Sequence, residues 1–312
     1  PGNNIMPSDV IQHISQLKAQ GAKIIKGDDE EAMKKAANPE MLKKQLGLKM
    51  IRRVNSVGHH YFIANLTNQD YDTWVQLADG EQNGIWYNPM TGKYHNARFG
   101  EKGVELIMRS GESRILITSS KPISEWNLGP DVKPIGIEPQ VAAAGSKIDL
   151  TPLTWNLSFI EEAPQVGETY KLNGLKTWEG LSDKAKVTMG TGVYETTFKL
   201  SKEDAKKQWA IDLGDVRESA RVYINGQYIG CAWAVPYTLN CENTLIKGKN
   251  TIRIEVTNLP ANRIAELDRE GVKWRKMKEI NVVDINYKKT TYEDWKPVPS
   301  GLNSYVKLIE IK

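Results

Sequence analysis

The fold of the last half of this 312-residue chain is decided by the stretch 220–226, which reads Ala-Arg-Val-Tyr-Ile-Asn-Gly. Apolar side chains alternate with more polar ones up to Ile224, as in a strand that buries one face. Asn225 and Gly226 both tolerate the positive φ angles of a type I′ turn, so the chain should reverse there as a β-hairpin. The stretch therefore predicts antiparallel β-structure.

The same period of two recurs on both sides of this hairpin. It is carried by Trp155, Leu157 and Phe159, by Tyr194, Thr196, Phe198 and Leu200, by Trp209, Ile211 and Leu213, and by Ile252, Ile254 and Val256. Short strands separated by turns are typical of a β-sandwich, and no helical repeat interrupts these strands. We predict that residues 147–312 fold as one all-β domain.

Several fixed motifs accompany these strands. They are Trp178, Gly190–Phe198, Leu213–Val216, Ala220–Gly226, Gly230, Trp233, Pro236-Tyr237, Lys247–Asn250 and Val256–Asn258. Together they resemble the sugar-binding, galactose-binding-like jelly roll of family 2 glycoside hydrolases. Ala261–Ile264 and Pro299–Leu302 are more similar to the C-terminal region of family 106 α-L-rhamnosidases, in which a catalytic barrel precedes β-domains. The resemblance implies that this chain is the C-terminal, non-barrel part of such a hydrolase.

A second set of strands precedes the jelly roll. Its members are Tyr61–Ala64, Ile85–Tyr87, the alternating residues of 104–108, and Ile115–Ile117. Spacing of about ten residues, with Gly- and Pro-containing turns, predicts a small antiparallel β-sandwich at 50–120. Residues 121–146 are loose and proline-rich, and we interpret them as a linker.

Residues 1–48 have a different, α/β pattern. A helix should start near Ser8, a short strand should cover Ala22–Ile25, and a second helical stretch should run from Glu30 to Leu46. Strands of the parallel type need neighbours on both sides, so this segment is interpreted as a remnant of a larger doubly wound domain. The predicted fold class is mainly β, with two β-sandwich domains preceded by a short α/β remnant.

Charge and hydropathy exclude two classes of partner. The net charge is only +4, with 42 basic and 38 acidic residues, and the densest basic stretch, 273–278, carries no nucleic-acid module around it. We interpret that stretch as a solvated segment with one buried aromatic, Trp274. No apolar run approaches the roughly 20 residues that span a bilayer. We therefore expect no nucleic acid and no membrane span.

Metal and cofactor signatures are also missing from the sequence. Cys231 and Cys241 form no Cys-x-x-Cys motif, and we favour two separate thiols over a disulfide between them. His59 and His60 are adjacent on a predicted strand, so they should point to opposite faces and not ligate one metal together. No glycine-rich phosphate loop occurs. The predicted metal and cofactor sets are both empty.

Catalytic residues are not expected in this chain. Glycosidases hold two carboxyl groups roughly 5–10 Å apart. A catalytic barrel takes about 250 residues of alternating strands and helices. The sequence predicts only one strand–helix unit, which is too little for a barrel. Glu293 and Asp294 are adjacent and belong to a solvated loop in our interpretation. We expect no turnover of aryl glycosides, rhamnosides included, although the resemblance implies that the parent protein is an O-glycosyl hydrolase.

Carbohydrate contacts are predicted on the loop side of the jelly roll. A sugar needs an aromatic platform beside planar amide or guanidinium donors, and the candidates are Trp233, Tyr237, Asn262 and Arg263, with Trp274 and Trp295 in reserve. Packing is the alternative role of the aromatics, and fixing a loop is the alternative for Asn262 and Arg263.

These observations predict the ancillary C-terminal region of a secreted or periplasmic glycoside hydrolase. Its partners would be an oligo- or polysaccharide and the catalytic barrel of the parent enzyme, which the jelly roll would support if it binds no sugar. Two other functions stay open: a protein-interaction module without sugar binding, and a hydrolase active in its own right. The sequence begins at Pro1 and no charged-then-apolar leader opens it, from which we expect processing or truncation.

Overall fold

The computed structural model describes residues 7–22, 40–56, 58–122, 125, 145–276, 286 and 290–311. The chain divides into two compact units, Pro1–Glu138 and Pro139–Lys312. Both are built mainly from antiparallel strands, which confirms the predicted mainly β fold class. Among the described residues, no helix has the length and apolarity needed to cross a membrane.

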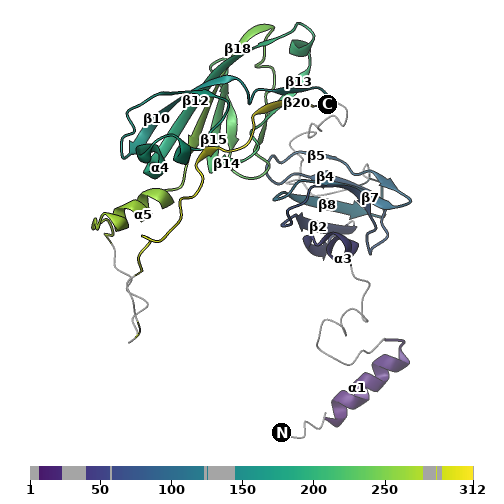
Figure 1. Cartoon of the computed structure of the whole chain (residues 1–312). Helices are drawn as coiled ribbons and strands as arrows, with labels where there is room; N and C mark the ends of the chain where they lie inside the picture. The colour runs from purple at the N-terminus through teal and green to yellow at the C-terminus, as the bar shows by residue number, and fades with distance from the viewer. Residues whose placement is uncertain are drawn as a thin grey trace. The chain divides into compact units, whose positions relative to one another are not determined.

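In the residues that the structure describes, the first unit has the helices α1 and α3 and two antiparallel sheets (Figure 1). Its elements are α1 (Ser8–Ala19), α3 (Met41–Leu46), β1 (Lys49–Val54), β2 (Gly58–Ala64), β3 (Tyr71–Val75), β4 (Asn83–Tyr87), β5 (Tyr94–Asn96), β6 (Phe99–Gly100), β7 (Gly103–Met108) and β8 (Ser113–Ser119). One sheet has the order β1-β2-β8-β4-β5 and the other β3-β7-β6. The core lies between them, because buried Tyr61, Ile63 and Leu116 of the first sheet pack with Val104 and Leu106 of the second.

Helix α3 corrects the domain boundary that the sequence suggested at residue 48. Leu42 of this helix and Leu48 after it are both completely buried in the core of the first unit. These residues therefore belong to the β-domain and not to a separate α/β segment. Helix α1 buries none of its residues. The expected strand at Ala22–Ile25 falls on residues of which only Ala22 is described, so the doubly wound remnant stays a prediction.

The second unit is a β-sandwich (Figure 1). Its elements are β9 (Lys147–Asp149), β10 (Thr154–Ala163), β11 (Tyr170–Asn173), η2 (Trp178–Gly180), α4 (Asp183–Val187), β12 (Met189–Leu200), η3 (Asp204–Lys206), β13 (Gln208–Asp212), β14 (Val216–Arg217), β15 (Ser219–Ile224), β16 (Gln227–Ala232), β17 (Thr238–Asn240), β18 (Gly248–Thr257), α5 (Ala261–Arg269), β19 (Gly301–Leu302) and β20 (Lys307–Ile311). A six-stranded sheet, β11-β10-β12-β18-β15-β16, faces a four-stranded sheet, β17-β13-β20-β9. Side chains of both sheets form one core, with Trp155 and Ile254 from the first and Ile211 and Leu308 from the second.

The hairpin that decides the fold has the predicted geometry. Asn225 and Gly226 have φ angles of 51° and 82°, and Ile224 pairs with Gln227 directly across the turn. The Asn225 side chain also donates to the Thr244 carbonyl at 2.9 Å. The turn thus joins β15 to β16 and fixes the register of both strands.

The motif residues Trp178 and Tyr194 are buried and hold the C-terminal segment in place. Trp178 Nε1 donates to the Tyr194 hydroxyl at 2.8 Å, and the backbone N–H of Leu302 donates to the same hydroxyl at 3.3 Å. A Cβ at Gly301 would lie 2.3 Å from that hydroxyl, and the φ of Gly301 is +97°. Only glycine fits there without displacing the core, so these motif residues are structural.

Candidate functional site

One face of the six-stranded sheet packs on the core and the other carries polar side chains. In β12, for example, Glu195 and Thr197 are exposed whereas Tyr194, Thr196 and Phe198 are buried. This alternation follows from the two-residue period of a strand. The outward face of the sheet is therefore the place where the jelly roll can meet a ligand without disturbing its core.

Six side chains on this face stand directly opposite one another, one from each strand, and we call them the outward row. In order across the sheet they are Lys171, Asn156, Glu195, Arg253, Tyr223 and Tyr228. Five strand spacings of about 4.8 Å make the row roughly 24 Å long. Such a row suits an extended ligand that lies across the strands.

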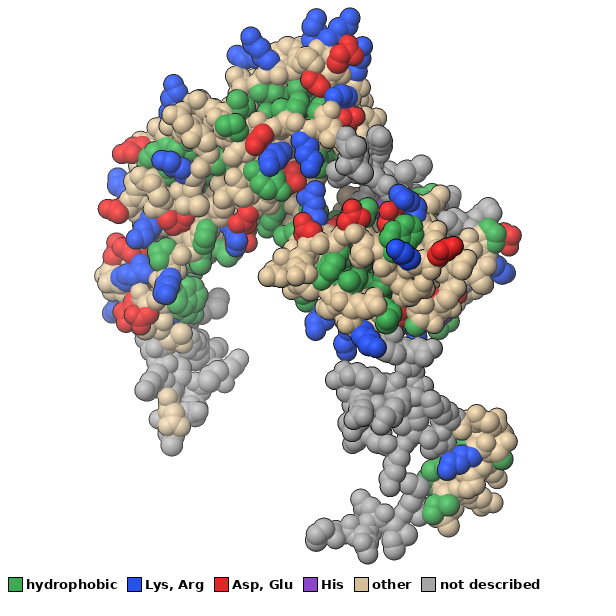
Figure 2. All heavy atoms as spheres, turned by 45° about the vertical axis from the view of Figure 1, so that its right-hand side comes forward, with side chains coloured by type: hydrophobic (Ala, Val, Ile, Leu, Met, Phe, Trp, Pro, Cys, Tyr) green, Lys and Arg blue, Asp and Glu red, His purple; other side chains and the backbone are tan. Residues whose placement is uncertain are grey.

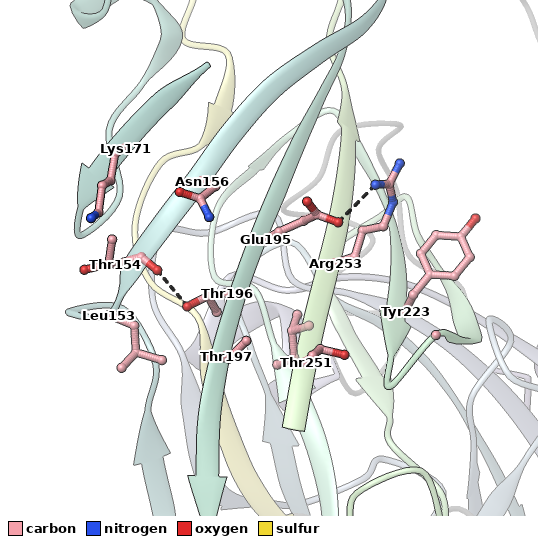
Figure 3. Close-up of a pocket in the computed structure, with 12 residues that line it drawn as sticks. Leu153, Thr154, Asn156, Lys171, Glu195, Thr196, Thr197, Tyr223, Thr251 and Arg253 are labelled. Atoms are coloured by element: carbon pink, nitrogen blue, oxygen red, sulfur yellow. Dashed lines mark hydrogen bonds and ion pairs between the residues drawn. The ribbon is translucent and has the colours of Figure 1, made fainter. Parts of the chain in front are cut away.

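The outward row lies along a surface groove (Figure 3). The groove has a volume of about 840 Å³, and five of the six row residues line it, all except Tyr228. A second line of small hydroxyl side chains, Thr154, Thr197 and Thr251, lies beside the row. The groove therefore presents a wall of hydrogen-bonding groups with the Tyr223 ring toward one end.

Arg253 is held at the centre of the groove by two carboxylates. Its Nη1 donates to Glu195 Oε1 at 3.1 Å, and its Nε donates to Glu255 Oε1 at 2.9 Å. Partial burial lowers the pKa of Arg253, but the hydrogen bonds to Glu255 and Glu195 outweigh this and raise the pKa above its usual value. The guanidinium is therefore charged and fixed in orientation, so that donors and acceptors alternate along the row.

The Tyr223 ring is also held in place. It packs against Tyr228 with ring centroids 5.3 Å apart and an interplanar angle of 51°. Tyrosine combines an apolar ring with a hydroxyl tip, and such a ring beside an amide and a guanidinium can contact both the C–H face and the hydroxyl groups of a sugar.

Trp233 and Tyr237, predicted from the sequence, lie in the loop between β16 and β17. The Trp233 side chain is 64% exposed, which keeps it available as a stacking platform. Tyr237 is partly buried, its carbonyl accepts from the N–H of Leu213, and burial raises the pKa of its hydroxyl. Of the two, Trp233 is the more accessible residue.

Asn262 and Arg263 lie on α5 and are engaged within the protein. The Asn262 amide donates to the Val298 carbonyl at 2.9 Å and accepts from the Val298 N–H at 2.8 Å. Arg263 forms an ion pair with Glu270 at 3.8 Å. Asn262 is 5% exposed, so its amide fixes the C-terminal segment against α5, which is the alternative role considered for it.

The two reserve tryptophans are brought together near α5 by Tyr292. Ring centroids of Trp274 and Tyr292 are 6.4 Å apart, and those of Tyr292 and Trp295 are 4.4 Å apart. Trp274 Nε1 donates to Asp268 at 2.7 Å, and the Arg275 guanidinium lies 5.1 Å from the Trp274 ring. Trp274 is thus fixed by its neighbours, whereas Trp295 keeps 47% of its surface exposed.

The outward row is not among the residues predicted from the sequence. Asn156, Glu195 and Arg253 each occupy a polar position between apolar ones, where a solvated surface residue is the ordinary interpretation. The signal that could have found them is register, because the Asn225-Gly226 turn aligns Tyr223 with β16. The alignment of Tyr223 with the row residues on β10, β12 and β18 depends on long-range strand pairing, which the local sequence does not specify.

Comparisons with known proteins agree with this fold. Residues 182–302 match the family described as glycosyl hydrolase 2 galactose-binding domain-like. A curated protein of Formosa agariphila named "Putative beta-glucuronidase" is 26% identical over 256 residues, which are 76% of this chain and 21% of that protein. The structure of a rhamnosidase from Novosphingobium sp. PP1Y covers 96% of this chain at 22% identity and a TM-score of 0.58.

These matches identify one domain of this chain and cover only part of the longer relatives. The chain spans about a fifth of the length of the Formosa protein and about a quarter of the rhamnosidase. The likeness to the rhamnosidase is a likeness of fold. The second unit contains a galactose-binding-like domain of the kind found in glycoside hydrolases, as its motifs predicted.

Proposed function

Starting from the galactose-binding-like domain of the glycoside hydrolase type that this chain contains, we propose that the chain is an ancillary, non-catalytic region of such a hydrolase and that its jelly roll binds carbohydrate. The binding surface would be the groove over the outward row. The parent enzyme would be exported, periplasmic or secreted, and would carry its catalytic carboxylates on a barrel outside this chain. The chain alone would hydrolyse no glycoside.

The outward row is the observation that carries the proposal. Asn156 supplies an amide, Glu195 a carboxylate, and Arg253 a guanidinium, all in register on three neighbouring strands. Planar polar groups of this kind form paired hydrogen bonds with vicinal hydroxyls, and the Tyr223 ring can take the C–H face of a sugar. Ordering a flexible glycan on an open groove costs free energy, so the expected dissociation constant is in the millimolar range, about −4 kcal/mol.

A glycan titration followed by NMR on the whole chain tests this proposal. The panel should contain neutral, rhamnose-containing and uronic-acid-containing oligosaccharides, because the groove holds both a carboxylate and two cationic side chains. We expect Asn156→Ala to weaken binding severalfold with little effect on stability, because Asn156 is exposed. Arg221→Ala is the matched control, since Arg221 of β15 is also exposed and pairs with Glu255 but does not line the groove.

Two outcomes would contradict the site or the function. If binding is lost in Trp233→Ala and kept in Asn156→Ala, sugar is bound by the exposed loop between β16 and β17. If no member of the panel shifts any resonance at high concentration, carbohydrate binding is wrong and support of the parent's barrel is the better function.

Protein docking is the second candidate, and a specific surface favours it. Leu259, Val272, Trp295 and Val298 are all exposed by more than a third of their surface. They flank α5 at both ends, and Val298 and Trp295 are tied to it by Asn262 and Arg269. Figure 2 shows hydrophobic side chains among charged ones on this part of the surface. An apolar patch of this kind could receive a neighbouring domain, such as the parent's barrel.

A further inference from the structure

Three ligand-type side chains meet in the first unit, far in sequence from the jelly roll. His59 lies on β2, and Asp79 and Glu81 flank Gly80 in the turn that leads from β3 to β4. Gly80 has a φ of +70°, which lets the turn bring both carboxylates to the same side. One imidazole nitrogen and one oxygen from each carboxylate lie within 4.8 Å of one another. We call these three residues the His59 cluster.

The cluster is partly buried, and two of its potential ligand atoms lack a hydrogen bond. The side chains of Asp79, Glu81 and His59 are 3%, 14% and 22% exposed. His59 Nδ1 and Glu81 Oε2 are both shielded from solvent and neither makes a hydrogen bond. A buried carboxylate without a compensating charge is costly, and so is a buried nitrogen without a hydrogen bond.

The distances in the cluster fit a bound cation better than a hydrogen bond. His59 Nδ1 lies 3.2 Å from Asp79 Oδ2 and 3.5 Å from Glu81 Oε1, yet neither approach is aligned as a hydrogen bond. Ligands around a tetrahedral Zn²⁺, at bond lengths of about 2.0–2.1 Å, are roughly 3.3 Å apart. The two nitrogen–oxygen separations bracket that value.

Neighbouring residues hold the carboxylates in this arrangement. The hydroxyls of Tyr61 and Thr118 donate to Asp79 Oδ2 at 2.7 and 3.0 Å, and the backbone N–H of Glu81 donates to Asp79 Oδ1 at 3.1 Å. A Cβ at residue 58 would lie 2.6 Å from Glu81 Oε2, so Gly58 leaves the room that this carboxylate occupies. Hydrogen bonds that orient a ligating carboxylate are a regular part of metal sites.

Arg52 is the nearby cation that could have neutralised the cluster, but it has another partner. Its guanidinium forms an ion pair with Glu40 Oε1 at 2.5 Å. Asp79 is near enough to help raise the pKa of Arg52, but among the described residues both carboxylates of the cluster have only His59 as an ion-pair partner. The two carboxylates place negative charge in a partly buried site, which a divalent cation would compensate.

We propose that His59, Asp79 and Glu81 bind a divalent transition-metal ion, with Zn²⁺ as the best match. One nitrogen and two carboxylate oxygens suit Zn²⁺ more than Mg²⁺ or Ca²⁺, which prefer oxygen ligands alone. Three protein ligands leave at least one position for water. The ion would tie the turn after β3 to β2 and so stabilise the first unit.

The test is a Zn²⁺ titration of the whole chain after treatment with a chelator, followed by calorimetry and by equilibrium dialysis with metal analysis. We expect one ion per chain and at least roughly tenfold weaker binding in Glu81→Gln and His59→Gln, because removing even an outer partner of a site costs 10–100-fold. His60→Gln is the matched control. His60 is the next residue on β2, its Nδ1 lies 2.6 Å from the Asn55 amide, and it should not alter binding.

Three outcomes would overturn the proposal. They are substoichiometric Zn²⁺ after dialysis, equal affinity in wild type and Glu81→Gln, and Mg²⁺ binding as tight as Zn²⁺. Glu81→Gln preserves the size of the side chain, and circular dichroism of the metal-free variants shows whether each one folds. If His59→Gln does not fold, Glu81→Gln alone decides the outcome.

Discussion

The outward row of the second unit and the His59 cluster of the first unit hold similar polar side chains in opposite settings. In the row, Glu195 is half exposed and is paired with Arg253. In the cluster, the side chains of Asp79 and Glu81 are mostly shielded from solvent, and their ion-pair partner among the described residues is a histidine. Water and a guanidinium satisfy the first arrangement without a ligand, whereas the second leaves charge uncompensated. The difference suggests weak, adaptable binding in the groove and tighter, more specific binding in the cluster.

The largest expected effect is a loss of stability in the second unit that leaves Zn²⁺ binding by the first unit unchanged. Trp155 is completely buried in the core of the second unit, next to Asn156 of the outward row. We expect Trp155→Ala to lower the free energy of unfolding of this unit by about 3–5 kcal/mol, and to remove glycan binding with it. Zn²⁺ binding should not change, because its ligands belong to the other compact unit. Urea unfolding and metal dialysis on the same sample measure both effects.

A control on the same strand makes that result specific. Ile160 of β10 is 40% exposed, and Ile160→Ala should change stability by no more than about 0.5 kcal/mol. Loss of zinc binding in Trp155→Ala would mean that the two units do not act separately.

Metal removal is expected to affect the first unit alone. Zinc-saturated protein should be more stable than chelator-treated protein by about 2.7 kcal/mol when free Zn²⁺ is about 100 times the dissociation constant. Thermal unfolding with and without zinc measures the shift, and the second unit should unfold at the same temperature in both samples. A shift of equal size in Glu81→Gln would show that zinc stabilises the chain from another site.

The fold of the second unit could be predicted because its signals are local. The Asn225-Gly226 turn specifies the register of β15 with β16, and the alternation around Tyr194 and Phe198 specifies a strand with one buried face. The helix that contains Leu42 was assigned to the wrong unit, because its helical period shows that one face is buried but not against which partner. The pattern of residues 1–48 does not indicate that the helix packs on the sheet that begins at Lys49.

The two candidate sites were harder to predict than the fold. His59 and His60 contact different residues, Asp79 and Asn55, and the carboxylate neighbours of His59 follow about 20 residues later in a turn without a local metal-site motif. Nothing local joins Asp79 to β2, since only the pairing of β2, β8 and β4 places them side by side. Asn262 shows that residue type alone does not reveal a role, because its amide, which is of a type suited to sugar, bonds to the backbone of Val298.

The two cysteines also differ in solvent accessibility. Both are free, Cys241 is completely buried and Cys231 is partly exposed. Burial raises the pKa of the Cys241 thiol to about 12 from its usual value of 9.0. A raised folded-state pKa contributes stability that is fully present below pH 9 and is lost as the pH rises toward 12. We expect native-state alkylation to modify Cys231 alone.

Two measurements check this expectation. Mass spectrometry of alkylated peptides should find Cys241 modified only after unfolding. The decrease in unfolding free energy of the second unit above pH 9 should be shallower in Cys241→Ala than in wild type, because the titrating group is gone. Rapid modification of Cys241 in the folded protein would show that its strand end opens readily.

The smallest effect on stability, and the sharpest test of the comparison, comes from the two carboxylates that hold Arg253. Glu195 lies in the groove and its side chain is 52% exposed, whereas Glu255 lies outside the groove and is 11% exposed. An exposed ion pair contributes less than about 1 kcal/mol, so Glu195→Gln should leave stability almost unchanged. Glu255→Gln should cost about 1–3 kcal/mol, because a more buried charged hydrogen bond is weakened.

Glycan binding should show the reverse order, with a severalfold loss in Glu195→Gln and little change in Glu255→Gln, since of these two carboxylates only Glu195 can accept from a ligand hydroxyl. If both variants lose binding equally, the groove acts by holding Arg253 in place and Glu195 makes no contact of its own. Chemical-shift titrations and urea unfolding of the two variants distinguish these possibilities, and the same pair of measurements decides whether exposure or pairing governs what this face of the sheet can bind.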